Sequence, residues 1–224
     1  MDSRLEEDVE NKKDKIVESL STWGKSNIRD FPWRKERTPY KTLIAEVILR
    51  RTTAKAACRV YETLVKRYPN VYTLSHAKVE DLEEILSAVG YHKQRSRILK
   101  GMADFIVSEY KGEIPSEKGY LTKIPHVGQY IAGAILSLGY GIPSTMVDSN
   151  VQRIISRIFF NVLPDKRRYQ TILEIVEAIA PQSNHDFFNF TMIDFGALVC
   201  RYEKPRCKEC PLYMICEYPS KYLI

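Results

Sequence analysis

Hydrophobic residues recur three or four positions apart along most of the chain, with charged and polar residues between them. Near the N-terminus this spacing predicts an amphipathic helix over residues 9–23. Another helix is predicted from Pro39, because proline is favoured at the first helical position. Further helices are predicted over residues 54–68, 79–86, 93–110, 151–160, 168–180 and 187–199, with Pro164 and Pro181 separating the last three. Since no alternating strand pattern, internal repeat or glycine-rich nucleotide loop is present, the chain is predicted to be all-α.

The stretch from Tyr120 to Arg153 joins two helical patterns through a short turn. A first apolar helix closes at Ile124, residues 125–128 (Pro-His-Val-Gly) form a break, and helical spacing resumes after it. Gly128 allows a tight turn and brings main-chain N–H groups up to an anion, for which DNA phosphate is the natural candidate. On Gly128 alone, an ordinary loop between two helices is the better interpretation.

Glu46 is the one acidic residue inside the apolar stretch that follows Pro39. A buried carboxylate is costly unless it is partnered or used, so its position suggests a functional group. The alternative is a glutamate on the solvent side of the helix, and the residues alone leave the two interpretations equal.

Four of the five cysteines lie in the last 25 residues, at Cys200, Cys207, Cys210 and Cys216. Their spacing, C-x6-C-x2-C-x5-C, does not resemble a secreted disulfide framework and indicates a metal site. Four thiolates can hold an iron–sulfur cluster or one tetrahedral zinc ion, and spacing alone leaves both open. Zinc is the weaker interpretation because zinc ribbons usually pair two C-x2-C knuckles and only one is present.

Charge and hydropathy limit the class of protein. Lysine and arginine number 34 against 28 aspartates and glutamates, which gives a net charge of +6 and a pI near 9.0. This excess suits a polyanionic partner without identifying one. The apolar runs are interrupted well before the ~18 residues of a membrane span, and the N-terminus has no hydrophobic signal core. A soluble, cytoplasmic protein without a membrane partner is therefore expected.

The whole pattern of hairpin, glycine, helix and a following aspartate resembles the helix-hairpin-helix DNA glycosylases. Their hairpin runs Leu-Pro-Gly-Val-Gly and ends at an essential aspartate, whose position Asp148 occupies here. One departure is His126, which stands where the family usually has the first glycine of the hairpin. Histidine enters left-handed backbone conformations more readily than most residues other than glycine, so the turn can survive the exchange.

The resemblance covers nearly the whole chain and implies two helical lobes with a DNA-binding cleft between them. Residues 30–141 form the central bundle with the hairpin, and residues 1–29 join 142–224 in the second lobe. The cysteine spacing matches the [4Fe–4S] cluster loop of the iron–sulfur members, here residues 200–216, which pins a basic loop against DNA. The implied partner is double-stranded DNA with a mismatch, bound by a monomer that associates with the nucleoid through that DNA.

The resemblance also implies a set of catalytic residues, with Glu46 and Tyr130 on one side of the cleft and Asp148 on the other. The nucleotide is flipped out of the duplex, because no side chain reaches the glycosidic bond of a stacked base. Asp148, kept ionised by a helix N-terminus, stabilises the oxocarbenium-like sugar and orients or deprotonates water, while Glu46 hydrogen-bonds the leaving base. Strand-cleaving relatives carry lysine at the position of Tyr130, whose phenol cannot form an imine, so efficient lyase activity is not expected. Tyr130 also fits as a tyrosine packed at the helix start.

The DNA contacts implied are Arg50, Arg51, Tyr91, His126, Gly128 and Gln129. Arg51 matches the residue that fills the gap left by the flipped nucleotide. The turn around Tyr91 supplies a second wedge in the family, although a tyrosine there packs in the core or loop by default. The basic run of Lys93, Arg95, Arg97 and Lys100 either lines phosphates or forms a solvated face.

Three functions compete. Removal of thymine or uracil opposite guanine is favoured by Glu46 followed by Arg50 and Arg51, and by a chain that ends soon after the cysteines. An adenine glycosylase would share Glu46, Tyr130 and Asp148. That branch, however, normally has two glutamines before the threonine that Thr52 matches here, where this chain has Arg50 and Arg51, and it usually adds a C-terminal domain. A non-catalytic DNA-binding protein is disfavoured because both acids are retained.

Overall fold

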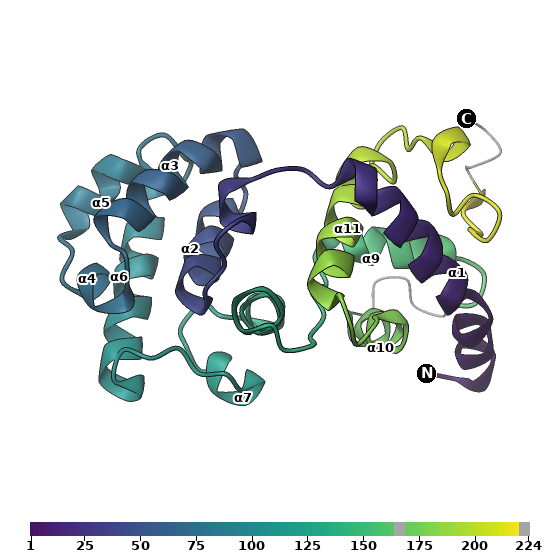
Figure 1. Cartoon of the computed structure of the whole chain (residues 1–224), viewed down its shortest axis with the longest axis horizontal. Helices are drawn as coiled ribbons and strands as arrows, with labels where there is room; N and C mark the ends of the chain where they lie inside the picture. Colours follow the sequence, from purple (N-terminus) through teal and green to yellow (C-terminus); the bar gives the residue numbers. More distant parts are fainter. Residues whose placement is uncertain (164–168, 220–224) are drawn as a thin grey trace. The chain divides into compact units, whose positions relative to one another are not determined.

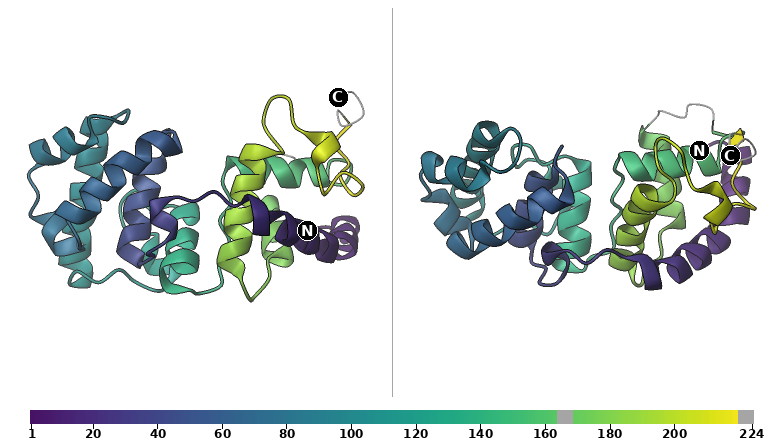
Figure 2. Two further views of the ribbon diagram at one scale, coloured as in Figure 1. Left: turned by 45° about the horizontal axis from the view of Figure 1, so that its top comes forward. Right: turned by 90° about the horizontal axis from the view of Figure 1, so that it is seen from above.

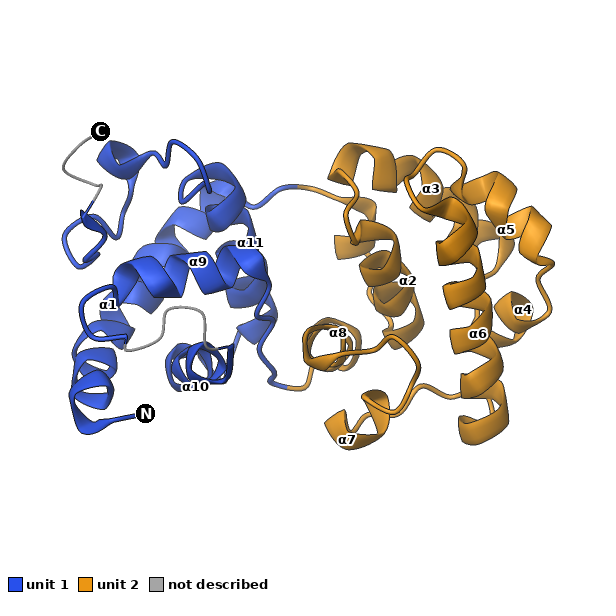
Figure 3. Cartoon of the chain, turned by 180° about the vertical axis from the view of Figure 1, so that it is seen from behind, with its two compact units in different colours: residues 1–29, 143–224 blue, residues 30–142 orange. Residues whose placement is uncertain are grey.

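The computed structural model describes residues 1–163 and 169–219, and every regular element in these residues is a helix (Figures 1 and 2). Pro164 and Arg168, which the sequence places in a break and at a helix start, lie outside the described residues. Contacts between Cα atoms divide the chain into two compact units, residues 30–142 and residues 1–29 with 143–224 (Figure 3). Of the described helices, none is long and apolar enough to cross a membrane.

The unit of residues 30–142 is a bundle around one buried helix, α2 (Pro39–Leu49). Its other elements are η1 (Pro32–Arg34), α3 (Ala54–Arg67), α4 (Val71–Ser75), α5 (Val79–Leu86), α6 (His92–Tyr110), α7 (Lys118–Leu121), α8 (Gln129–Ala134) and the π-helix η2 (Ile135–Tyr140). The helices α3, α6, α8 and η2 all pack against α2. The functional turns of this unit are therefore anchored to a common core.

Helix α2 is buried around its whole circumference over residues 42–48. It begins at Pro39 as predicted, and the Thr38 hydroxyl caps it by accepting the Lys41 N–H at 3.2 Å. The π-helix η2 approaches closely, because a Cβ on Gly139 would lie 2.7 Å from the Cα of Pro39. Because residues 42–48 are buried on every side, Glu46 lies inside the unit and not on the solvent side of the helix.

The second unit packs α1 (Ser3–Asn27) against a group of three helices. These are α9 (Ser149–Ile158), α10 (Tyr169–Ile179) and α11 (His185–Leu198), followed by the short η3 (Cys207–Glu209). The carboxylate of Asp194 is fully buried and accepts hydrogen bonds from Arg29, at 2.8 Å from the main-chain N–H and at 2.9 and 2.6 Å from the guanidinium. This ion pair, with its carboxylate buried and both oxygens hydrogen-bonded, fixes the segment just after α1 on α11.

The predicted helix boundaries differ from the structure in four places. Helix α1 begins at Ser3 and not at residue 9, because the Asp2 carboxylate caps it by accepting the Leu5 N–H at 2.9 Å. Helix α4 was not predicted; it is a single short segment stabilised by a capping box between Asn70 and Thr73. The helix after the hairpin continues as a π-helix, which apolar spacing cannot distinguish from an α-helix. The first helix of the hairpin, predicted to close at Ile124, ends at Leu121, because the following residues form turns. The helices predicted over residues 54–68, 79–86, 93–110, 151–160 and 187–199 begin and end within two residues of the predictions.

Candidate functional site

The hairpin between α7 and α8 is formed, but its unusual backbone residue is not the glycine. His126 adopts a left-handed conformation with φ of 66°, while Gly128 has φ of −92° and ψ of −178°, which any residue can adopt. The expectation that Gly128 supplies the tight turn is therefore wrong. A Cβ on Gly128 would also meet no atom within 4 Å. Neither backbone conformation nor packing within the protein requires glycine here, which leaves an open approach to the exposed main chain.

The hairpin residues present both a buried anchor and an exposed tip. Ile124 and Val127 are buried and joined by a hydrogen bond from the Val127 N–H to the Ile124 carbonyl at 3.0 Å. His126, Gly128 and Gln129 are exposed. Since the first N–H groups of a helix have no partner within it, the start of α8 offers donors to an anion.

Glu46 and Tyr130 belong to the unit of residues 30–142. The Glu46 side chain comes from the middle of α2 and its residue is 8% exposed. Tyr130 lies in the first turn of α8, is half-buried and packs against the hydrophobic core of the unit. The packing expected of a tyrosine at a helix start is therefore present, with part of the side chain still accessible.

Two turns of the same unit bring Arg51 and Tyr91 together. The Arg51 guanidinium lies 5.9 Å from the centre of the Tyr91 ring, within cation–π range. Tyr91 is 59% exposed, so of the two default interpretations, core packing is wrong, while packing within the turn against Arg51 is compatible with the structure. The two residues line a cavity of about 400 Å³, together with Arg50 and Gln94.

Arg50 and Arg95 connect these turns to their surroundings. The Arg50 guanidinium donates to the main-chain carbonyl of His126 at 2.5 Å and so links the end of α2 to the hairpin. Arg95 is only 4% exposed and points into the protein. Both interpretations of the basic run, phosphate lining and a solvated face, are thus wrong for Arg95, because helical packing turns this one position inward.

Asp148 lies in the other unit, at the N-cap of α9, where the sequence places it. One carboxylate oxygen accepts the Val151 N–H and the other accepts the amide of Asn150, each at 2.8 Å. The residue is half-buried. Both oxygens are therefore oriented by hydrogen bonds from the first turn of α9, and the helix N-terminus favours the negative charge.

A chain of hydrogen bonds continues from Asp148 to the first cysteine. The side-chain amide oxygen of Asn150 (Oδ1) accepts from Arg153 at 2.7 Å, and Arg153 also donates to the main-chain carbonyls of Gly196 and Cys200, both at 2.8 Å. Neither Asn150 nor Arg153 is among the site residues predicted from the sequence. Their spacing of three residues on one helix face was the signal that could have indicated the pair.

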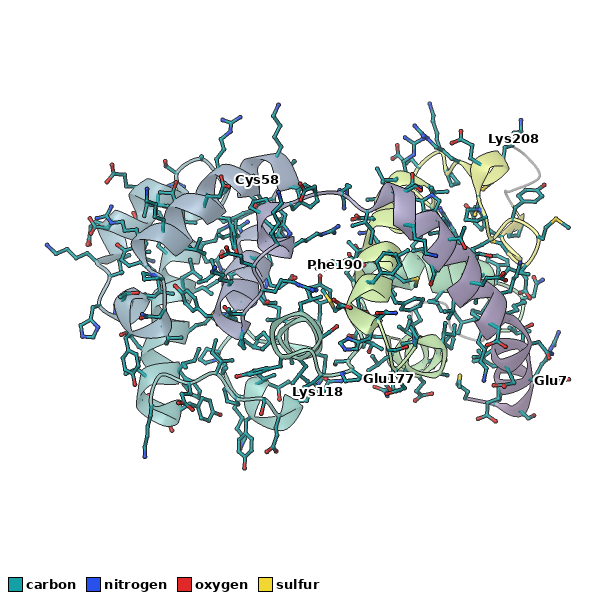
Figure 4. The ribbon with its side chains drawn as sticks, in the orientation of Figure 1. Glu7, Cys58, Lys118, Glu177, Phe190 and Lys208 are labelled. Carbon is teal, nitrogen blue, oxygen red and sulfur yellow. The ribbon has the colours of Figure 1, made fainter. Side chains whose placement is uncertain are left out.

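The four C-terminal cysteines follow α11 on one loop, whose basic residues include Lys208, whereas Cys58 belongs to α3 of the other unit (Figure 4). The thiol of Cys216 donates to the Arg157 carbonyl, and the Arg157 guanidinium donates to the Cys200 sulfur, each at 3.4 Å. Burial raises the pKa of the Cys210 thiol to about 12, and the nearby Cys200, Cys216 and Cys207 add to this effect.

These thiols form an all-sulfur donor set that suits a [4Fe–4S] cluster or zinc. Within the described residues, no three candidate ligands are already arranged around a metal position. A bound cation reverses the effect of burial, because it favours the thiolate that coordinates it. The chemistry of the donors therefore fits the [4Fe–4S] cluster that the family resemblance implies.

Comparison with known proteins defines the class to which this fold and these residues belong. Residues 44–178 match the HhH-GPD superfamily of base excision DNA repair proteins. This match spans more than half of the chain, and the chain belongs to that superfamily.

Individual relatives are similar over almost the whole length. The thymine/uracil-DNA glycosylase of Methanothermobacter thermautotrophicus is 31% identical over 217 residues, which cover 96% of this chain and 98% of the relative. Among solved structures, a thermostable thymine-DNA glycosylase superimposes with a TM-score of 0.89 at 30% identity, covering 95% of this chain and 98% of that one. A trapped covalent intermediate of endonuclease III with DNA gives a TM-score of 0.80 at 25% identity, covering 95% and 99%.

Proposed function

We propose that the chain is a DNA glycosylase that removes thymine or uracil opposite guanine by hydrolysing the N-glycosidic bond. The observation that carries the proposal is Asp148, whose carboxylate is oriented at the N-cap of α9 after a formed helix-hairpin-helix motif. The similar archaeal proteins named as thymine and thymine/uracil glycosylases support this substrate class.

The proposed reaction begins with extrusion of the mismatched nucleotide, which costs less than extrusion of a paired one. The two compact units are proposed to be the two lobes that receive it. Asp148 acts on the sugar: its negative charge stabilises the oxocarbenium-like transition state and orients the attacking water. Glu46, buried in the middle of α2, is the group proposed to hydrogen-bond the leaving base.

The exposed hairpin tip and the two turns are proposed to hold the DNA. His126, Gly128 and Gln129 meet the phosphate backbone, where main-chain N–H groups of the hairpin supply donors. Arg51 fills the vacated stack and Tyr91 inserts as a second wedge. Arg50 approaches the same strand but also donates to the hairpin carbonyl, so part of its role is to hold the hairpin.

We propose that Cys200, Cys207, Cys210 and Cys216 hold a [4Fe–4S] cluster. When bound, such a cluster fixes the four thiolate-bearing segments of the loop relative to one another. The loop then presents Arg201, Lys204, Arg206 and Lys208 to DNA. The protein is proposed to act as a cytoplasmic monomer on mismatched duplex.

One experiment tests the substrate. The protein is incubated with otherwise identical duplexes that contain T·G, U·G, A·G and A·oxidised-G pairs, and the released bases are separated by chromatography. Release of thymine and uracil from pairs with guanine is expected. Release of adenine alone would assign the enzyme to the adenine branch, and binding without release from any duplex would show a non-catalytic protein.

A further inference from the structure

Arg95 uses its whole guanidinium inside the protein. Its Nε donates to the Gly90 carbonyl at 2.7 Å, and Nη1 donates to the carbonyls of Val47 and Ile48 at 2.5 and 2.7 Å. Nη2 donates to the Arg50 carbonyl and, at 2.7 Å, to the Thr52 hydroxyl. All five N–H donors of an arginine are therefore occupied, and four of the five acceptors are main-chain carbonyls.

These acceptors belong to two separate turns. Val47, Ile48 and Arg50 carry carbonyls at the C-terminal end of α2, which a helix leaves without intrahelical partners and which attract a cation. Gly90 lies in the turn between α5 and α6. A single buried side chain thus joins the turn that carries Arg51 to the turn that carries Tyr91.

Both turns place a non-glycine residue in the left-handed region at the proposed wedge. Arg51 has φ of 50° and Tyr91 has φ of 59°. Their side chains lie within cation–π range, 5.9 Å apart, and both line the cavity. Such conformations persist where the surroundings over-determine them, and the carbonyl on each side is held here by Arg95: Arg50 precedes Arg51, and Gly90 precedes Tyr91.

We propose that Arg95 is a positioning residue for base flipping, which holds the Arg51 and Tyr91 turns at one fixed separation so that they enter the duplex together. The inference rests on the proposed function and deepens it. Arg95 does not contact DNA in this scheme; it acts through the main chain of the two wedges. Lysine cannot replace it, because one ammonium has three donors and no planar fork.

The test compares Arg95→Lys with wild type on a U·G duplex that carries 2-aminopurine beside the uracil. We expect binding to a matched duplex to change by less than about threefold, because phosphate contacts supply most non-specific affinity. Single-turnover uracil release should fall by about 10- to 100-fold, and the rapid rise in 2-aminopurine fluorescence that reports unstacking should shrink. The milder Thr52→Val removes one acceptor without changing side-chain volume and should give a smaller loss in the same direction.

A double mutant separates positioning from a general loss of stability. If Arg95 acts through the two wedges, then Arg51→Ala with Arg95→Lys should lose less unstacking signal than the sum of the two single losses, because only the Tyr91 turn is left to be displaced. Additive losses, or an Arg95→Lys protein with wild-type fluorescence and release, would overturn the proposal. The matched control is Arg67→Lys, in the same unit, where the arginine forms a partly exposed ion pair with Asp81 at 3.0 Å and no change is expected.

The fluorescence measurement does not require base release. A wild-type protein that unstacks the U·G site but releases no base would contradict the proposed function while leaving the role of Arg95 measurable in the variants. Equal rates of base release by the wild-type and Arg95→Lys proteins would contradict the role of Arg95 and leave the proposed function intact.

Discussion

The two units each contain an arginine that organises the residues around it, and they do so in different ways. Arg95, in the unit of residues 30–142, donates mainly to main-chain carbonyls and holds two turns. Arg153, in the other unit, is linked through the side chain of Asn150 to one carboxylate, that of Asp148, and donates to the carbonyl of Cys200. Burial lowers the pKa of both guanidinium groups.

The difference corresponds to what each unit is proposed to do. A wedge must keep its shape when it enters a stacked duplex, so the main chain of both turns, at Arg50 and Gly90, is hydrogen-bonded to Arg95. A catalytic carboxylate must keep a rotamer, so its two oxygens are held by donors from its own helix, Val151 and Asn150. Changes in the first unit should therefore affect flipping, and changes in the second should affect bond cleavage.

The largest effect is expected for Asp148→Asn. Asparagine caps a helix about as well as aspartate, so the fold should be preserved. The loss of negative charge beside the sugar should lower single-turnover base release by about 10³-fold or more, with matched-duplex binding nearly unchanged. Release rates and gel-shift affinities measure the two effects. A near wild-type release rate would remove Asp148 from catalysis.

The cysteine loop should give the next largest effect. Purified wild-type protein should be brown, with about four iron and four sulfide per chain, because four thiolates are the ligand set of a cubane cluster. Cys210→Ser should lose this colour and weaken duplex binding on the order of 100-fold, since the basic loop is no longer held. Cys58→Ser is the control and should keep both. Stoichiometric zinc in protein made anaerobically with ample iron would contradict the assignment.

Most of the fold followed from the sequence, because apolar residues at helical spacing specify which face of each helix is buried. The position of Asp148 at the head of α9 was predicted from the family resemblance and not from apolar spacing. Contacts between turns were not predictable: the inward direction of Arg95 depends on the packing of α6 against α2, and nothing local distinguishes it from the lysines and arginines beside it. The left-handed backbone of His126 was anticipated from residue type, but the extended backbone of Gly128 was not.

Arg51→Ala is expected to affect flipping more than binding. Removal of a side chain that fills the vacated stack should lower base release by about 10- to 30-fold on a mismatched duplex, while affinity for matched duplex falls only slightly. Comparing affinities for matched and U·G duplexes checks this. An equal loss for both would make Arg51 a phosphate contact only.

Asn150→Ala should show the corresponding, smaller effect in the other unit. Loss of one donor to Asp148 leaves the Val151 N–H in place, so base release should fall by about tenfold without loss of duplex affinity or of 2-aminopurine unstacking. Gln152→Ala on the same helix is the control. If Asn150→Ala reduces unstacking and cleavage equally, the separation of tasks between the two units is wrong.

Of these variants, Tyr130→Lys should change the rate of base release least, but it should add strand cleavage after the base is released. Wild-type protein should give little borohydride-trapped complex on T·G or U·G duplex, and strand breaks should appear only after alkali or heat, because a phenol cannot form an imine with the sugar. The half-buried position at the start of α8 leaves part of residue 130 accessible. A lysine there should gain trapping and strand cleavage, with base release within about threefold of wild type. Lys123, on the other side of the hairpin, supplies the control: Lys123→Gln should not reduce any residual trapping. Efficient trapping by wild type, or no gain in a folded, DNA-binding Tyr130→Lys protein, would show that residue 130 does not face the sugar on which Asp148 is proposed to act.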